Sequence, residues 1–153
     1  MRWITLLVLL IPLSGFCGGP GLSSGQLLYV PVYSHIYTGN RERPFNLAVT
    51  LSIRNTDPRT SLRLTVVDYF DTEGRLIRQY LKSPVQLNPL GSIRYVVAEK
   101  DVSGGSGANF LVRWEAASAI NVPVVESVMI GAQSGQGISF TSQAREILEN
   151  TQN

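Results

Sequence analysis

Alternation of apolar and polar side chains is the feature that most constrains what this chain can fold into. Between residues 45 and 54 every second residue is apolar, namely Phe45, Leu47, Val49, Leu51 and Ile53. Successive side chains of an extended strand point to opposite faces, so this period of two directs one face into a core and the other toward solvent. The stretch 45–81 therefore predicts three antiparallel strands joined by two turns.

Turn-forming residues separate these predicted strands. Asn55-Thr56-Asp57-Pro58 interrupts the first alternation, because Asn and Asp bond their own backbone and Pro fixes φ. Asp71-Thr72-Glu73-Gly74 follows the second strand, and Gly74 suits a position with positive φ. We expect each of the two turns to close a hairpin.

Further segments with strand character follow at roughly ten-residue spacing, which gives seven to nine strands in all. They lie at 26–37, 85–87, 93–97, 110–116, 122–130 and 138–140, and Trp114 alternates with Phe110 and Val112 as a core residue. Only 142–150 suggests a helix, short and polar enough to fray. We predict an all-β fold, an immunoglobulin-like antiparallel β-sandwich with a short C-terminal helix.

The start of the chain is predicted to be an export signal. Arg2 precedes the apolar run Ile4 to Leu13, and small residues follow, as in secretory signals. This run is also shorter than the roughly 20 residues needed to span a bilayer. We assign residues 1–17 to the signal, 18–25 to a flexible spacer, 26–141 to the sandwich domain and 142–153 to a polar tail.

The single cysteine, Cys17, excludes an intrachain disulfide and leaves two interpretations. Lipidation at Cys17 would tether the domain to a membrane, although Ser14 and Phe16 depart from the usual lipoprotein pattern. Ordinary cleavage just after Cys17 is the alternative, since Gly15 and Cys17 are both small. Either way the domain is expected outside the cytoplasm, periplasmic or anchored by lipid.

Charge and histidine content argue against nucleic-acid binding, histidine-dependent catalysis and zinc binding. The formal net charge is +2 with scattered Lys and Arg, whereas nucleic-acid binding needs clustered basic residues. The only histidine, His35, has Ser34 as its neighbour, and adjacent strand residues point to opposite faces. Zinc sites usually need several Cys or His ligands. We predict a non-enzymatic domain without a cofactor or a nucleic-acid partner.

Three carboxylates are weak candidates for a metal site. Asp68 and Asp71 lie in the segment DYFDTEG, and Asp101 opens a later loop. The segment resembles part of a calcium loop but lacks its alternating ligands and closing Glu. The interpretation that we favour is that Asp71 serves the hairpin turn and that Asp68 pairs with an arginine such as Arg63 or Arg78.

The glycine-rich loop SGGSG, residues 103–107, also has two interpretations. Successive backbone N–H groups could bind an anion there, with Gly104, Gly105, Ser106 and Asn109 as the candidate residues. A phosphate loop, however, normally leads into a helix and ends in Lys, and a strand follows here. A conformationally demanding connector is the favoured interpretation.

An aromatic stripe is the best candidate for an interaction surface. Tyr29, Tyr33, His35 and Tyr37 share one face of the predicted strand 26–37, and Pro31 places that strand at a sheet edge or a bulge. Rings on an exposed edge suit a partner surface, which makes Tyr33, His35 and Tyr37 binding candidates. Packing inside the sandwich is the alternative and is favoured.

Several segments together resemble a known bacterial family. They are Arg43-Pro44-Phe45-Asn46-Leu47, Ser52 to Asp57, Asp68-Tyr69-Phe70-Asp71, Pro89-Leu90, SGGSGANF at 103–110, Val128 to Gly131 and Gly137 to Phe140. Over most of 29–140 the chain resembles domain of unknown function 3124. The resemblance implies bacterial origin, export and a lipoprotein-like start, and it carries over no catalytic residue.

These observations predict a non-enzymatic binding or assembly module of the bacterial cell envelope, whose partner is an envelope protein or a small ligand. Membrane contact is expected only through a lipid at Cys17. The alternative is a periplasmic domain that senses a small molecule or an ion, calcium or an anion, through Asp68, Asp71 and Asp101.

Overall fold

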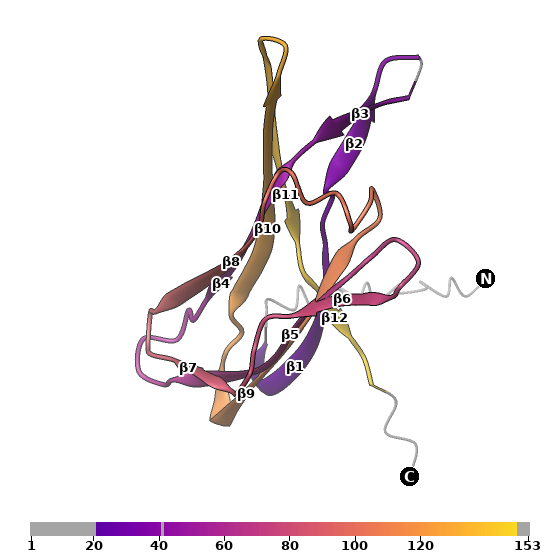
Figure 1. Ribbon diagram of the computed structural model, residues 1–153. Coiled ribbons are helices and arrows are strands. Elements are labelled where there is room, and N and C mark those ends of the chain that lie inside the picture. Colours follow the sequence, from indigo (N-terminus) through magenta and orange to yellow (C-terminus); the bar gives the residue numbers. More distant parts are fainter. Residues whose placement is uncertain (1–20, 41, 150–153) are drawn as a thin grey trace, which may run out of the picture.

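The computed structural model describes residues 21–40 and 42–149, and every regular element among them is a β-strand (Figure 1). The described part of the chain therefore contains no helix, and none that could cross a membrane. The signal segment and Cys17 lie outside the described residues.

Ten strands form two antiparallel sheets, and two more form a separate hairpin. The larger sheet has the order β12-β1-β9-β5-β6, and β7 also pairs with β5. Its strands are β1 (Leu22–Pro31), β5 (Leu62–Phe70), β6 (Leu76–Gln79), β7 (Val85–Leu87), β9 (Asn109–Asn121) and β12 (Arg145–Ile147). The smaller sheet has the order β11-β10-β4-β8; its strands are β4 (Ala48–Arg54), β8 (Ser92–Val97), β10 (Val124–Gln133) and β11 (Gln136–Gln143). The hairpin pairs β2 (His35–Thr38) with β3 (Arg43–Asn46).

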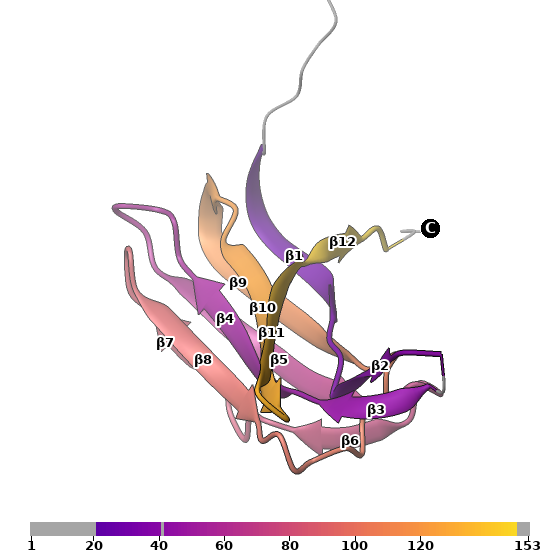
Figure 2. The ribbon, with the colours of Figure 1, turned by 90° about the horizontal axis from the view of Figure 1, so that it is seen from above.

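The two sheets share one hydrophobic core, as expected for a β-sandwich (Figures 1 and 2). The alternation that begins at Phe45 is confirmed, because all five of its apolar side chains are 4% exposed or less. Trp114 of β9 is 1% exposed, which confirms it as a core residue. Burial of one such large apolar side chain stabilises the fold by about 1.5–3 kcal/mol.

The prediction that residues 55–58 close a hairpin is wrong. β4 pairs with β10 and β8, whereas β5 pairs with β9, so the chain crosses from one sheet to the other. The buried Asn55 fixes this crossing, because its amide donates to the carbonyls of Thr60 (2.8 Å) and Asn88 (3.0 Å). The second turn does close the β5–β6 hairpin, with Gly74 at φ 77°.

Both ends of the domain differ from prediction. The helix expected over 142–150 is replaced by the end of β11 and by β12, which pairs with β1 through Leu27 and Ile147. An isolated polar helix of this length would be marginal in water, whereas strand pairing here uses an available sheet edge. Leu22, Ser23 and Gly25, which the sequence assigned to the spacer, pair with β9 as part of β1. The predicted strand 26–37 is interrupted at residues 32–34, just after Pro31.

The pH dependence of stability should show how much Asp57 stabilises the loop between β4 and β5. The Asp57 carboxylate accepts hydrogen bonds from the backbone N–H groups of Arg59 (3.0 Å) and Thr60 (2.8 Å) and from Asn121, which together lower its pKa to about 2. A depressed folded-state pKa stabilises the fold above the ordinary value near 3.8, and this stabilisation disappears as the pH falls through about 2. We expect the unfolding free energy, measured by urea denaturation, to fall more between about pH 5 and pH 2 in the wild type than in Asp57→Asn. Parallel curves for the two proteins would contradict this role of Asp57.

Candidate functional site

The glycine-rich loop, with its flanking residues 101–108, is hydrogen-bonded to two segments that are distant in sequence. The Gly104 carbonyl accepts hydrogen bonds from the backbone N–H (2.9 Å) and the hydroxyl (3.0 Å) of Thr72 in the β5–β6 turn. The Gly105 carbonyl accepts in the same way from the N–H (3.0 Å) and the hydroxyl (2.9 Å) of Ser34. The structure thus brings the predicted loop and the segment before His35 together.

Several N–H groups that an anion would need are engaged inside the protein. Ser103 N–H donates to the Asp101 carboxylate (3.2 Å), Gly105 N–H to the Val102 carbonyl (3.2 Å), and Gly107 N–H to the Thr72 hydroxyl (3.1 Å). An anion-binding concavity needs successive N–H groups that point outward together. The geometry therefore favours the connector interpretation.

Gly104 is needed because the loop closes directly over Tyr69. A Cβ at residue 104 would lie 2.7 Å from Tyr69 Cζ and 2.8 Å from Ala108 Cβ. Tyr69 is fully buried, and burial, with a smaller effect of the Asp101 charge, raises its pKa to about 12. Among the described residues the Tyr69 hydroxyl has no hydrogen-bond partner, and the nearby Ser34 hydroxyl donates to the Gly105 carbonyl.

The predicted aromatic stripe is divided between two environments. Tyr33 lies between β1 and β2 and packs edge-on against Phe140 of β11, with ring centroids 5.6 Å apart. His35 and Tyr37 lie together on the β2–β3 hairpin, where His35 Nε2 is 3.3 Å from the Tyr37 hydroxyl and Tyr37 is 55% exposed. Tyr33 is thus partly buried against the core, and a binding role for Tyr33, His35 and Tyr37 stays a prediction.

The three candidate carboxylates each have separate partners. The Asp71 carboxylate accepts from the N–H (2.8 Å) and the guanidinium (2.7 Å) of Arg75, which lowers its pKa and places it in the turn as predicted. Within residues 21–40 and 42–149, no three His, Cys, Asp or Glu side chains are grouped to hold a metal ion.

The predicted pairing of Asp68 with Arg63 or Arg78 is not formed. Asp68 instead accepts a long hydrogen bond from Gln79 (3.5 Å), and Arg78 pairs with Asp101 at 3.3 Å. The reason is register, because β5–β6 pairing puts Gln79 opposite Asp68.

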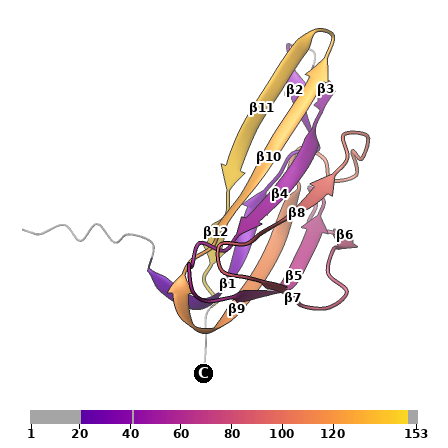
Figure 3. The same cartoon turned by 90° about the vertical axis from the view of Figure 1, so that its left-hand side faces the viewer.

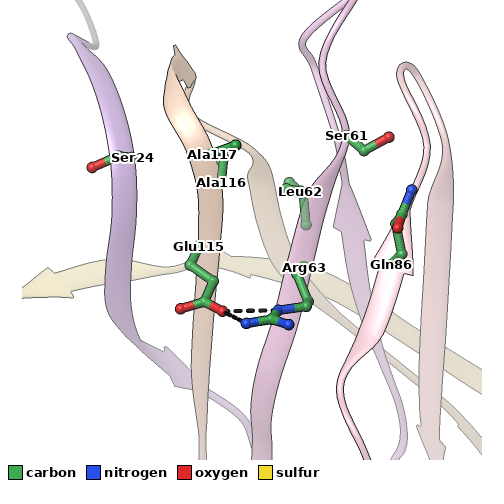
Figure 4. Close-up of a pocket in the computed structure, with 8 residues that line it drawn as sticks. All are labelled: Ser24, Ser61, Leu62, Arg63, Gln86, Glu115, Ala116 and Ala117. Carbon is green, nitrogen blue, oxygen red and sulfur yellow. Dashed lines mark hydrogen bonds and ion pairs between the residues drawn. The ribbon is translucent and has the colours of Figure 1, made fainter.

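A pocket of about 520 Å³, which the sequence did not reveal, opens on the larger sheet (Figure 4). It lies over β1, β9, β5 and β7 and is lined by Ser24, Ser61, Leu62, Arg63, Gln86, Glu115, Ala116 and Ala117. Figure 4 shows Glu115 and Arg63 pointing toward each other between their strands, with Ser24 to one side and Gln86 to the other. Its volume falls within the range of small-ligand pockets.

A wide bulge in β9 forms one wall of this pocket. In the pairing of β9 with β1, Glu115 stands opposite Gly25 and the next paired residue of β9 is Ile120, opposite Ser23. The pairing of β9 with β5 ends at Glu115, which stands opposite Arg63. Residues 116–119 therefore have no partner in either ladder, and their side chains are only Ala and Ser. Bulges of this kind often occur beside binding sites, and residues 117–119 of this one are exposed.

The charged pair at the pocket contributes little to the stability of the fold. Arg63 and Glu115 stand directly opposite in the β5–β9 ladder, with Arg63 Nε 2.8 Å from Glu115 Oε1. Their side chains are 59% and 46% exposed, and exposed ion pairs contribute only about 0.2–1 kcal/mol. The run of small residues after Glu115 is the one sequence signal for the pocket, whereas the opposing Arg63 depends on strand register.

Comparison with known proteins places the chain in a family. The model of a family described as protein of unknown function (DUF3124) matches residues 25–147. Among solved structures, the chain is similar to one titled Crystal Structure of Thermotoga maritima 1070, with 9% identity, coverage of 78% of this chain and 92% of that chain, and a TM-score of 0.47. No curated protein matches the chain.

Substitution of Gly104 should expose the tight contact with Tyr69. We expect Gly104→Ala to lower the unfolding free energy by about 1–3 kcal/mol through overpacking, whereas Gly21→Ala, which has open space around it, should change it by less than about 1 kcal/mol. Tyr69→Phe removes an unpaired hydroxyl and should be neutral or stabilising. Added to Gly104→Ala, the Tyr69→Phe substitution should recover part of the lost unfolding free energy, measured by chemical denaturation. If the effects of the two substitutions were additive, the contact between residue 104 and Tyr69 would be contradicted.

Proposed function

The chain belongs to the DUF3124 family of proteins of unknown function, and from that premise we propose that it is a non-enzymatic binding module of the bacterial cell envelope that takes an extended peptide segment of an envelope protein. The binding site is the pocket formed by the β9 bulge together with Arg63, Glu115 and Gln86. All of the residues that line the pocket except Ser24 fall within the matched region.

The observation that carries this proposal is the unpaired backbone of residues 116–119 beside a weak ion pair. An extended peptide presents alternating N–H and C=O groups, which can extend a ladder where the protein's own pairing stops. Arg63 and Glu115 offer one charge of each sign for the side chains or termini of the peptide. No aromatic ring is present among the described residues that line the pocket, which disfavours a sugar that stacks on one.

Two further properties belong to the proposal and rest on other observations. Envelope location is supported by the signal-like pattern of residues 1–17. A non-enzymatic role is supported by the contacts of His35, because its ring nitrogen lies beside the Tyr37 hydroxyl while Ser34 donates to the Gly105 carbonyl. A proton relay from Ser34 to His35 would need the two side chains to face each other.

We also infer that the fold is immunoglobulin-like in its central strands. In immunoglobulin domains, B pairs with E in one sheet and C pairs with F in the other. Here β4 pairs with β8, and β5 pairs with β9, which matches that pattern. β10 takes the place of strand A beside β4, and β1 takes the place of strand G beside β9.

Titrations monitored by amide chemical shifts test the binding proposal. We expect trialanine and its acetylated, amidated form to shift the amides of residues 116–119, because both present a peptide backbone. Arg63→Gln should weaken binding of the charged form by about threefold to tenfold, while the matched control Arg94→Gln, on the other sheet, should leave binding unchanged.

Calcium chloride and sodium phosphate serve as comparison probes. Shifts caused by these salts near Asp68, Asp71 and Asp101, with none caused by the peptides, would favour the ion-sensing alternative. Absence of any peptide-induced shift at 116–119 would refute the peptide site.

A further inference from the structure

Strand β11 forms an open edge of the smaller sheet. It pairs with β10 on one side and ends the strand order β11-β10-β4-β8. Figures 1 and 3 show the β10–β11 hairpin extending beyond the body of the sandwich, at the same end as β2 and β3. Alternate backbone groups of such a strand point away from its sheet and can pair with another strand.

The turn of the hairpin identifies which backbone groups point outward. Ser134 and Gly135 have φ of 52° and 78°, as in a two-residue type I′ turn, and Gln133 stands opposite Gln136. This closing pair is hydrogen-bonded, and bonded pairs alternate along an antiparallel ladder. The N–H and C=O groups of Gly137, Ser139 and Thr141 therefore face the open edge.

The other sheet edges carry protections that β11 lacks. On β8, Arg94 occupies the centre, and the Tyr80 hydroxyl donates to the outward carbonyl of Val96 (3.2 Å). β12 is three residues long and carries Arg145 and Glu146, and β6 is also short and charged. Short length and charge are the usual defences of an edge strand. Residues 130–144, by contrast, contain neither a charged residue nor a proline.

We propose that β11 pairs with β11 of a second copy of this chain, antiparallel about a two-fold axis at Ser139. In this register Ser139 stands opposite its counterpart, and Gly137 stands opposite Thr141. The outward backbone groups of the three residues then satisfy one another. The two smaller sheets become one continuous sheet across the dimer.

The composition of β11 favours a second copy as the occupant. Identical strands place identical residues near the axis, so a charged strand would repel its own copy, and β11 has no charge. On the inner face the same register puts Ile138 opposite Phe140, both of which are only partly buried in one chain. Recognition of a different partner commonly relies on charge complementarity, which this edge does not offer.

Sedimentation equilibrium on the exported chain tests the dimer. A contact through one strand buries less than the roughly 1,200 Å² of a stable interface, so we expect a weight-average mass that rises with concentration toward twice that of one chain. Ser139→Lys places two ammonium groups together and should weaken association about tenfold or more, whereas Ser139→Thr and the edge control Ser92→Lys should not.

Hydrogen exchange distinguishes this pairing from other modes of association. As concentration rises, the amides of Gly137, Ser139 and Thr141 should gain protection, while those of Ile138 and Phe140, already bonded to β10, should be protected throughout. A wild type that stays monomeric, a dimer unaffected by Ser139→Lys, or protection that appears on another element would each overturn the proposal.

Discussion

The fold depends on apolar faces of period two that can be buried only against each other. β4 and β5 follow one another in the chain, and each has one such face. Placing them in different sheets lets the faces meet across the core, and the intervening residues must then bridge two layers. Asn55 and Asp57 make that bridge rigid, because their side chains bond backbone groups that have no ladder partner. Buried polar residues thus support the hydrophobic arrangement.

The same logic explains the glycine-rich loop at the far end of β8. Here too the chain crosses between sheets, and the loop must pass over a fully buried tyrosine. Only a residue without a Cβ fits above Tyr69, and the carbonyls of Gly104 and Gly105 hold the β5–β6 turn and Ser34 in place. The structure agrees with the connector interpretation favoured from the sequence, because hydrogen bonds join this loop to the β5–β6 turn and to Ser34. Its composition reflects space and backbone pairing.

The two surfaces that we propose for recognition lie where regular strand pairing stops. In the larger sheet, the β9 bulge leaves residues 116–119 without ladder partners beside an exposed charged pair. In the smaller sheet, β11 leaves alternate backbone groups open along an uncharged edge. Both surfaces offer main-chain hydrogen bonds more than side-chain chemistry. Such surfaces suit the recognition of other polypeptides, and they lie on different sheets.

Period-two patterning and turn residues act locally, so they were enough to predict the all-β class, the core residues of β4, the burial of Trp114 and the β5–β6 turn. Membership of the DUF3124 family was also readable from its segments. Which strands pair is visible only in the folded protein, where β4 and β5 lie in different sheets, residues 145–147 pair with β1, and Arg63 stands opposite Glu115. Side-chain alternation says which face of a strand is buried but not which neighbour lies beside it. Pairing between distant strands depends on how the whole set of faces can be buried together.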